Sequence, residues 1–260
     1  MNTFFLDRLN SEPHALAFAG QSTPWPVALA DQSANPALDE ALHTHAAAAQ
    51  ALLYPVSAEL LATTGRPVDL FGFEPNPARL GAAAAASASV PGIALTQLGA
   101  LLDAAALGYN PAQAKPVAVL GHSQGVLAVH MVQAICEAGS IDAAAAKIDE
   151  ILAIATLIGV AGTRQARQLG LAARHGEATP MLSVKDITRA QVDALIERVD
   201  GARGPIAVAV TNSATHYVLS GYPEDLAAFG VEVAKEHKRQ AKLREEKVRG
   251  GRVFGPTLEY

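Results

Sequence analysis

Ser123 is the leading candidate for a catalytic nucleophile, because it lies at the centre of the pentapeptide Gly121-His-Ser-Gln-Gly125. An apolar run from Pro116 to Leu120 precedes this pentapeptide, and an apolar pattern of helical period follows it from Val126. This order predicts a strand, a sharp turn and a helix, with glycines that allow the tight turn. Such a turn presents the serine hydroxyl at the top of a buried sheet, where it is suited to act as a nucleophile.

A second candidate follows the first predicted strand. The apolar run from His14 to Ala19 ends in Gly20-Gln-Ser-Thr-Pro-Trp25, which predicts a buried strand that runs into a loop. Gln21 then lies at the carboxyl end of a strand, where open α/β sheets place their ligands. This pattern alone fits two interpretations of Gln21 equally well: a ligand-binding residue and a solvated loop amide.

The composition predicts helices packed around a sheet. Half of the 260 residues are apolar, aromatic residues are few, and runs of alanine favour helices. A net charge of -5, with no dense basic stripe before Lys235, argues against nucleic acid as a partner. The single cysteine, Cys136, lies on the apolar face of the helix predicted after Ser123, so we expect it in the protein core. A lone cysteine that forms no intramolecular disulfide is typical of a protein from a reducing compartment. No leader-like segment, membrane-length apolar run or metal-ligand pattern stands out, so we expect a cytoplasmic protein without a membrane partner.

The spacing of apolar residues changes near residue 179. It divides the chain into a larger part, 1–178, and a smaller part, 179–260. The larger part includes a helix from Ile141 to about Val160, whose apolar residues are expected on or near the buried face: Ile148, Ile151, Leu152, Ile154, Ala155 and Ile158. The smaller part has the order β-α-β-β-α, with elements at Met181–Val184, Thr188–Val199, Ile206–Val210, His216–Ser220 and Glu224–Lys238. This order is one strand short of a ferredoxin-like unit, and the missing strand is expected at Arg252–Tyr260.

Five motifs together resemble, in order and spacing, the acyltransferase domain of fatty acid synthases. They are Ala17-Phe-Ala-Gly-Gln21, Leu95-Thr-Gln97, Gly121-His-Ser-Gln-Gly125, Pro180-Met-Leu-Ser183, and Val208-Ala-Val-Thr-Asn212 leading into Val218-Leu-Ser-Gly221. The family is close to the malonyl-CoA:acyl carrier protein transacylases, and the chain is most similar to the amino-terminal acetyl/acyl transferase region of fungal-type type I synthases. The fold class that follows is α/β: an α/β-hydrolase-like large subdomain with a central, mainly parallel sheet, and a small ferredoxin-like subdomain.

The resemblance implies a transfer in two half-reactions, from coenzyme A to Ser123 and then to the phosphopantetheine thiol of an acyl carrier protein domain. The backbone N–H of Gln124 and the residue Gln21 would hold the oxyanion. Further residues implied at the substrate pocket are His122, Gln97 and Asn212, of which His122 and Gln97 are equally explained by structural hydrogen bonds. No tightly bound cofactor is implied. The implied partners are acyl-CoA, the carrier domain, other synthase domains and, in a full-length protein, further copies of the chain.

Two positions depart from the family pattern. Malonyl-specific relatives carry an arginine directly before a glycine on the helix after the turn, and Ile158 precedes Gly159 here, unless the alignment shifts to Arg164. An isoleucine favours an acetyl or other uncharged acyl group, since a buried carboxylate would lack a partner. The family's general-base histidine lies in a Phe-His-Ser-like motif that these residues do not contain. We therefore expect an amino-terminal piece of a larger polypeptide, with its base beyond Tyr260 and with slow transfer when isolated.

Other functions remain open on the sequence. A malonyl or palmitoyl transferase of the same family would share the motifs. A serine hydrolase would need an Asp or Glu and then a His later in the chain. A scaffold module would keep the turn and serve mainly to dock other synthase domains.

Overall fold

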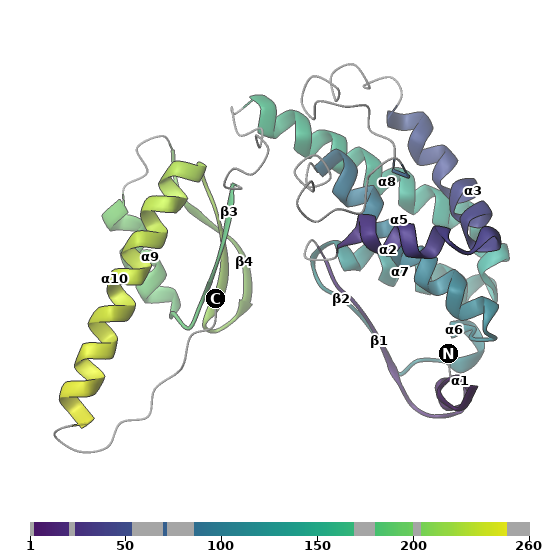
Figure 1. Ribbon diagram of the computed structural model, residues 1–260, viewed down its shortest axis with the longest axis horizontal. Coiled ribbons are helices and arrows are strands. Elements are labelled where there is room, and N and C mark those ends of the chain that lie inside the picture. Colours follow the sequence, from purple (N-terminus) through teal and green to yellow (C-terminus); the bar gives the residue numbers. More distant parts are fainter. Residues whose placement is uncertain are drawn as a thin grey trace. The chain divides into compact units, whose positions relative to one another are not determined.

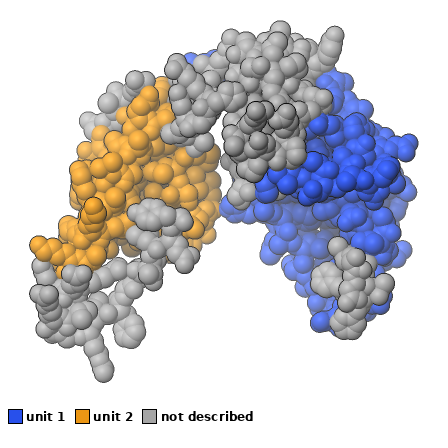
Figure 2. Space-filling model, in the orientation of Figure 1, with its two compact units in different colours: residues 1–175 blue, residues 176–260 orange. Residues whose placement is uncertain are grey.

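The chain divides into two compact units, residues 1–175 and 176–260 (Figure 2). The computed structural model describes residues 3–20, 24–53, 70–71, 86–168, 180–199 and 204–248. Each unit has a hydrophobic core of its own. The two units are therefore described separately.

Unit 1 consists of helices packed on one face of a two-stranded parallel sheet (Figure 1). The pairing of its strands runs from Ala15 opposite Ala118 to Phe18 opposite Gly121. Its elements in chain order are α1 (Thr3–Ser11), β1 (Ala15–Phe18), α2 (Trp25–Ser33), α3 (Pro36–Leu53), α5 (Ala86–Ala106), α6 (Pro111–Ala114), β2 (Ala118–Gly121), the 3₁₀ turn η3 (Ser123–Gly125), α7 (Val126–Ala138) and α8 (Ile141–Gln168). This is the predicted order of strand, sharp turn and helix around Ser123.

Helix α5 lies in the core of unit 1, between α2, α3 and α8. Its side chains Ile93, Leu95 and Leu98 are fully buried. By length and composition, α5 is also the one helix of the described ranges that is apolar enough to cross a membrane. Because most of it is buried inside unit 1, its composition is that of a core helix.

Some expectations about unit 1 are wrong. Ile154 and Ile158 are 50% and 52% exposed, although they were expected on or near the buried face of their helix. Cys136 is exposed rather than in the core. The reason is its position on α7, three residues after Gln133 and next to Glu137, both of which are exposed as well.

Helix α2 is missing from the sequence-based prediction. The sequence pattern predicts a loop from Gly20 to Trp25, yet the helix begins at Trp25 and has Pro26 in its first turn. A proline there costs no helical hydrogen bond, because the first N–H groups of a helix have no intrahelical acceptor. Trp25 and Leu29 then pack into the core of unit 1.

Unit 2 is a three-stranded antiparallel sheet with two helices on one face (Figure 1). Its elements are β3 (Met181–Lys185), α9 (Arg189–Val199), β4 (Ala207–Ser213), β5 (His216–Ser220) and α10 (Pro223–Val248). The strand order is β3-β5-β4, and β5 pairs with both neighbours. Alternate residues of the strands, such as Val184, Tyr217 and Leu219, point to the helices and form the core. The strand expected at residues 252–260 lies outside the described residues.

An acid-sensitive ion pair holds the middle of α10. The guanidinium of Arg239 donates to both carboxylate oxygens of Glu236, at 2.8 and 2.5 Å, and this lowers the pKa of Glu236 from 4.5 to about 2. A carboxyl whose pKa is lower in the folded state contributes stability above its unfolded pKa. That contribution is lost as the pH falls from about 4.5 towards about 2.

We expect Glu236→Gln to reduce the stability of unit 2 at neutral pH by about 1 kcal/mol, because its partner is mostly exposed to solvent. The same change should remove part of the stability loss between pH 4.5 and 2. Hydrogen exchange of the α10 amides measures both effects. Asp193→Asn, which breaks the exposed pair with Arg189, is the control and should change exchange little. An unchanged acid dependence in Glu236→Gln would contradict the assignment.

Candidate active site

Ser123 lies at the sharp turn between β2 and α7, with its backbone in the left-handed region at φ 54°. This conformation costs a non-glycine residue about 1–2 kcal/mol, so the surrounding contacts must hold it. The N–H of His122 donates to the carbonyl of Phe18 at 3.0 Å, and the N–H of Gly125 donates to the carbonyl of His122 at 2.9 Å. The serine is exposed, so its hydroxyl is accessible to a substrate.

The glycines on either side of Ser123 are required by close backbone contacts. A Cβ on Gly121 would lie 2.6 Å from the carbonyl group of Gly125. A Cβ on Gly125 would overlap the carbonyl oxygen of Phe18. The end of β1, the turn and the start of α7 therefore pack with no room for side chains, which fixes the position of Ser123 relative to β1.

Gly20, directly after β1, lies against the serine. A Cβ on Gly20 would lie 2.8 Å from the Cβ of Ser123 and 3.3 Å from the backbone nitrogen of Gln124. The sequence pattern singled out the next residue, Gln21, which lies outside the described residues. The structure thus shows that Gly20 lies against Ser123, the candidate nucleophile, a contact that sequence spacing alone did not reveal.

Gln97 on α5 holds the same segment in place. Its Nε2 donates to the carbonyl oxygen of Ala19 at 2.5 Å, and the side chain is buried. This bond is of the structural kind that the sequence left open for Gln97. The side-chain oxygens of Gln97 and Gln124 are buried and have no hydrogen-bond partner among the residues that the structure describes.

The backbone N–H of Gln124 is suited to stabilising negative charge. Gln124 is the second residue of η3, which continues directly into α7. N–H groups in a first helical turn have no intrahelical acceptor, and the helix dipole adds positive potential there. An oxyanion formed at an acyl group on Ser123 would be stabilised by these groups.

Ile158 lies on α8, where the residue after it allows two helices to approach closely. A Cβ on Gly159 would overlap the carbonyl oxygen of Ala86 at the start of α5. Ile158 itself is half exposed and offers a methyl-bearing surface without a charge. Its place next to a helix-packing glycine is defined, whereas its role towards a substrate stays a prediction.

Asn212 belongs to unit 2, where it forms a polar cluster with Ser183 and His216. The Oγ of Ser183 lies 2.9 Å from Nε2 of His216, and Nδ2 of Asn212 lies 3.4 Å from the same nitrogen. These three residues come from β3, β4 and β5 and are exposed or half exposed. The sequence analysis singled out Asn212 as a site residue but gave no such role to Ser183 or His216, because strand register, rather than spacing along the chain, brings the three together.

The hydroxyl of Ser123 makes no hydrogen bond to any histidine within the described ranges. The other described histidines are engaged or placed elsewhere: His14 bonds to Tyr109, His43 stacks on Phe71, His45 bonds to Asp149, His130 is exposed on α7, and His237 lies half-buried in α10 with its ring nitrogens covered. His175 lies outside the described residues. In the part of the chain that is described, no group of three His, Cys, Asp or Glu side chains forms a metal-binding arrangement.

Solved structures of bacterial transacylases share this fold. The malonyl CoA-acyl carrier protein transacylase fabD of Coxiella burnetii matches with a TM-score of 0.50 and 17% identity, over 87% of this chain and 58% of that one. The acyl-carrier-protein-S-malonyltransferase of Bartonella henselae matches with a TM-score of 0.46 and 21% identity, over 87% and 60%. At this identity, the likeness to the Coxiella burnetii protein concerns the fold alone.

The particular relatives are fatty acid synthases. Residues 180–260 match the family model of the fatty acid synthase central AT domain. The fatty acid synthase β subunit hexB of Dothistroma septosporum is 30% identical over 128 residues, which make up 44% of this chain and 7% of that protein. These matches confirm the resemblance to the acyltransferase domain of fatty acid synthases. The chain spans a small part of hexB and less than two thirds of the transacylases.

Proposed function

We propose that this chain carries the nucleophile of an acyltransferase that loads an acetyl or other uncharged acyl group onto an acyl carrier protein domain, priming fatty acid synthesis. The observation that supports this most directly is Ser123, exposed in a left-handed turn at the start of α7. The match of residues 180–260 to a fatty acid synthase domain supports fatty acid synthesis as the pathway in which this transfer takes place.

In the first half-reaction, Oγ of Ser123 would attack the thioester carbonyl of acyl-CoA. The C–S bond breaks, an ester forms on Ser123, and the serine proton leaves with the coenzyme A thiolate as free thiol. In the second half-reaction, the phosphopantetheine thiol of the carrier domain attacks the ester and restores the serine. The N–H of Gln124 would stabilise both oxyanions, together with Gln21 as the expected second donor.

The proton transfers need a base that no described histidine supplies to Ser123. We propose that the base is a histidine in polypeptide that follows Tyr260 and that this chain is part of a multifunctional synthase. The small unit would then be a ferredoxin-like subdomain whose fourth strand is added near residues 252–260. His122 and Asn212, which belong to different units, are each proposed as substrate-binding residues, and Gln97 would act through the backbone at Ala19.

Mass spectrometry after incubation with acetyl-CoA and with malonyl-CoA tests this function. The 260-residue chain and a version extended beyond Tyr260 should both be compared, with free acid measured in the same samples. An ester on Ser123 that transfers to carrier protein supports the transferase. Continuous release of free acid would instead show a serine hydrolase, and the absence of any adduct in the extended chain would favour the scaffold.

Acyl selectivity is assigned to Ile158. We expect Ile158→Arg in the extended chain to raise malonyl loading relative to acetyl loading by about tenfold or more, because a guanidinium pairs with the malonyl carboxylate. Gln165→Arg places the same charge at an exposed position two turns further along α8 and is the matched control. Efficient malonyl loading by the unsubstituted chain would contradict the proposed preference for an uncharged acyl group. It would favour a malonyl or palmitoyl transferase instead.

A further inference from the structure

The sheet of unit 2 has one face that its own helices leave uncovered (Figure 1). Val184, Tyr217 and Leu219 point to the helices and are buried. Because successive strand residues point to opposite faces, their neighbours along β3 and β5 point away from the helices. Lys185 is the last residue of β3, lies on this second face and is exposed.

Strand register places Lys185 directly opposite His216, and His216 opposite Ser213. Side chains opposite each other in an antiparallel pair have Cβ atoms about 5 Å apart. Lys185 makes no ion pair within the described ranges. The nearest carboxylate in sequence, Asp186, follows the end of β3 in the left-handed region at φ 56° and is not part of this row. The row therefore carries a cation without a counter-ion.

The imidazole of His216 adds a hydrogen-bond donor beside this cation. Its Nε2 lies 2.9 Å from Oγ of Ser183 and 3.4 Å from Nδ2 of Asn212. An amide nitrogen can only donate, so Nε2 is the acceptor of the ring and Nδ1 carries the proton. No residue in the described part of the chain accepts a hydrogen bond from Nδ1. Lys185 and His216 thus offer an ammonium group and an N–H group to an acceptor from outside this cluster.

Apolar side chains continue along the same face. Val218 lies opposite both Ser183 and Val210 in the next row, and Met181 belongs to the row after that. Val210 and Met181 are 37% and 40% exposed. A ligand that matches this face therefore has an anionic group with apolar groups directly beside it.

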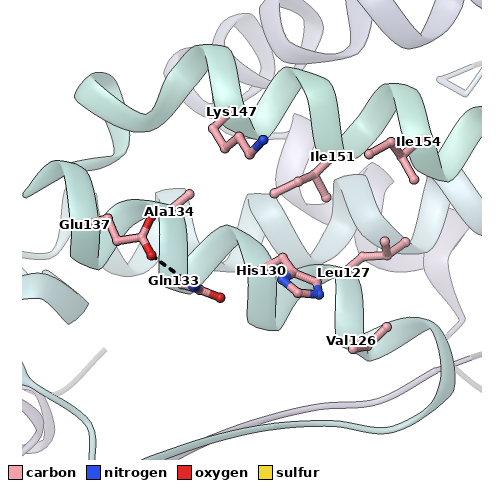
Figure 3. A pocket seen from close by; sticks show the side chains of 9 residues that line it. All are labelled: Val126, Leu127, His130, Gln133, Ala134, Glu137, Lys147, Ile151 and Ile154. Carbon is pink, nitrogen blue, oxygen red and sulfur yellow. Dashed lines mark hydrogen bonds between the residues drawn. The ribbon is translucent and has the colours of Figure 1, made fainter.

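The groove between α7 and α8 in unit 1 has a different charge pattern. Its lining includes His130, Glu137 and Lys147 (Figure 3), and Lys147 donates to Glu150 at 2.7 Å. A lysine that already has a carboxylate partner gains less from a second anion. The groove is therefore not a comparable anion site.

We propose that Lys185 and Nδ1 of His216 bind the phosphate of 4′-phosphopantetheine, with the dimethyl-bearing carbon of this arm against Val218 and Val210. Phosphate oxygens accept charge-assisted hydrogen bonds from ammonium and N–H groups. The methyl groups of the arm follow its phosphate ester closely, as the apolar row follows the donor row. The choice of ligand rests on the proposed function, in which coenzyme A and the carrier domain both present this arm.

Titration of the 260-residue chain with 4′-phosphopantetheine and with pantetheine, which lacks the phosphate, tests the proposal. The phosphate should tighten binding by about tenfold, because it adds charge-assisted hydrogen bonds. Lys185→Met should weaken binding of 4′-phosphopantetheine by about fivefold and leave binding of pantetheine unchanged. Lys242→Met, which removes an equally exposed lysine from α10, is the matched control and should change neither affinity. Shifts of the amide resonances of residues 183–185 and 216–218 should accompany binding.

Several results would overturn the proposal. Equal affinity for the two ligands, or the same loss in Lys242→Met as in Lys185→Met, would exclude the phosphate contact. Inorganic phosphate that binds as tightly as 4′-phosphopantetheine would exclude the contact of the arm with the apolar row. Competition by coenzyme A or by a carrier domain that bears the arm shows which source uses the site, and competition by neither would also exclude it.

This inference and the proposed function fail separately. Acyl loading of Ser123 without any phosphate-dependent binding at Lys185 would count against the inference alone. Phosphate-dependent binding without acyl loading of Ser123 would count against the proposed function alone.

Discussion

Replacing Ser123 with alanine is expected to abolish formation of the acyl-enzyme. The hydroxyl is the only part of the residue that is lost, and the left-handed backbone of the turn accepts alanine as it accepts serine. Removing a covalent nucleophile typically costs on the order of 10³-fold or more in rate. The measurement is the fraction of extended chain that carries an acyl group after incubation with acetyl-CoA, followed by peptide mapping of the adduct.

Ser183→Ala is the matched control for this experiment. Ser183 is exposed and lies 2.9 Å from a histidine nitrogen, so it is the serine that competes most directly as an acyl acceptor. The control variant should keep the adduct of the unsubstituted chain. An adduct that survives in Ser123→Ala and disappears in Ser183→Ala would reject Ser123 as the nucleophile.

Gly125→Ala is expected to destabilise unit 1 by about 2–4 kcal/mol, as overpacking against an immobile backbone does. The new Cβ would overlap the carbonyl oxygen of Phe18 and lie 2.8 Å from its carbonyl carbon. The backbone of Gly125 is right-handed, at φ -59°, so alanine can adopt its dihedral angles without a penalty. The steric clash alone therefore determines that the substitution lowers the stability of unit 1. Urea unfolding followed by the fluorescence of Trp25, which is buried in unit 1, measures the effect.

Gly230→Ala provides the opposite case. Gly230 lies in α10, and a Cβ there would meet nothing within 4 Å. Alanine should therefore stabilise α10 by about 0.5–1 kcal/mol through its helix propensity. Equal stability of Gly125→Ala and the unsubstituted chain would show that β1 and the turn can separate without cost, which would contradict the close contact between Gly125 and Phe18.

The sequence predicted local features well where neighbouring residues determine them. The strand before Ser123, the turn and the start of α7 follow from an apolar run, two glycines and a helical period, and the structure has all three. The strand β5 has the predicted bounds, His216–Ser220. Faces of helices were less predictable, because Ile154 and Ile158 follow the period of a buried face but have nothing packed over them in the described ranges.

The candidate site was predictable only in part for the same reason. Ser123 and its glycines are close in sequence, whereas the contact of Gly20 with Ser123 depends on how β1 lies beside β2. The pairing of Ser183 with His216 depends on the register of β3 and β5. The general base was expected from the family resemblance alone, because these residues contain no Phe-His-Ser-like motif, and its identity stays a prediction.

The positive φ at Ser123 also restricts which nucleophile this fold can carry. Cysteine has one heavy atom beyond Cβ, as serine does, and can occupy the left-handed turn with similar strain. Threonine branches at Cβ, and β-branched residues are true outliers at positive φ. Backbone geometry therefore admits a thiol and disfavours a secondary alcohol before reactivity is considered.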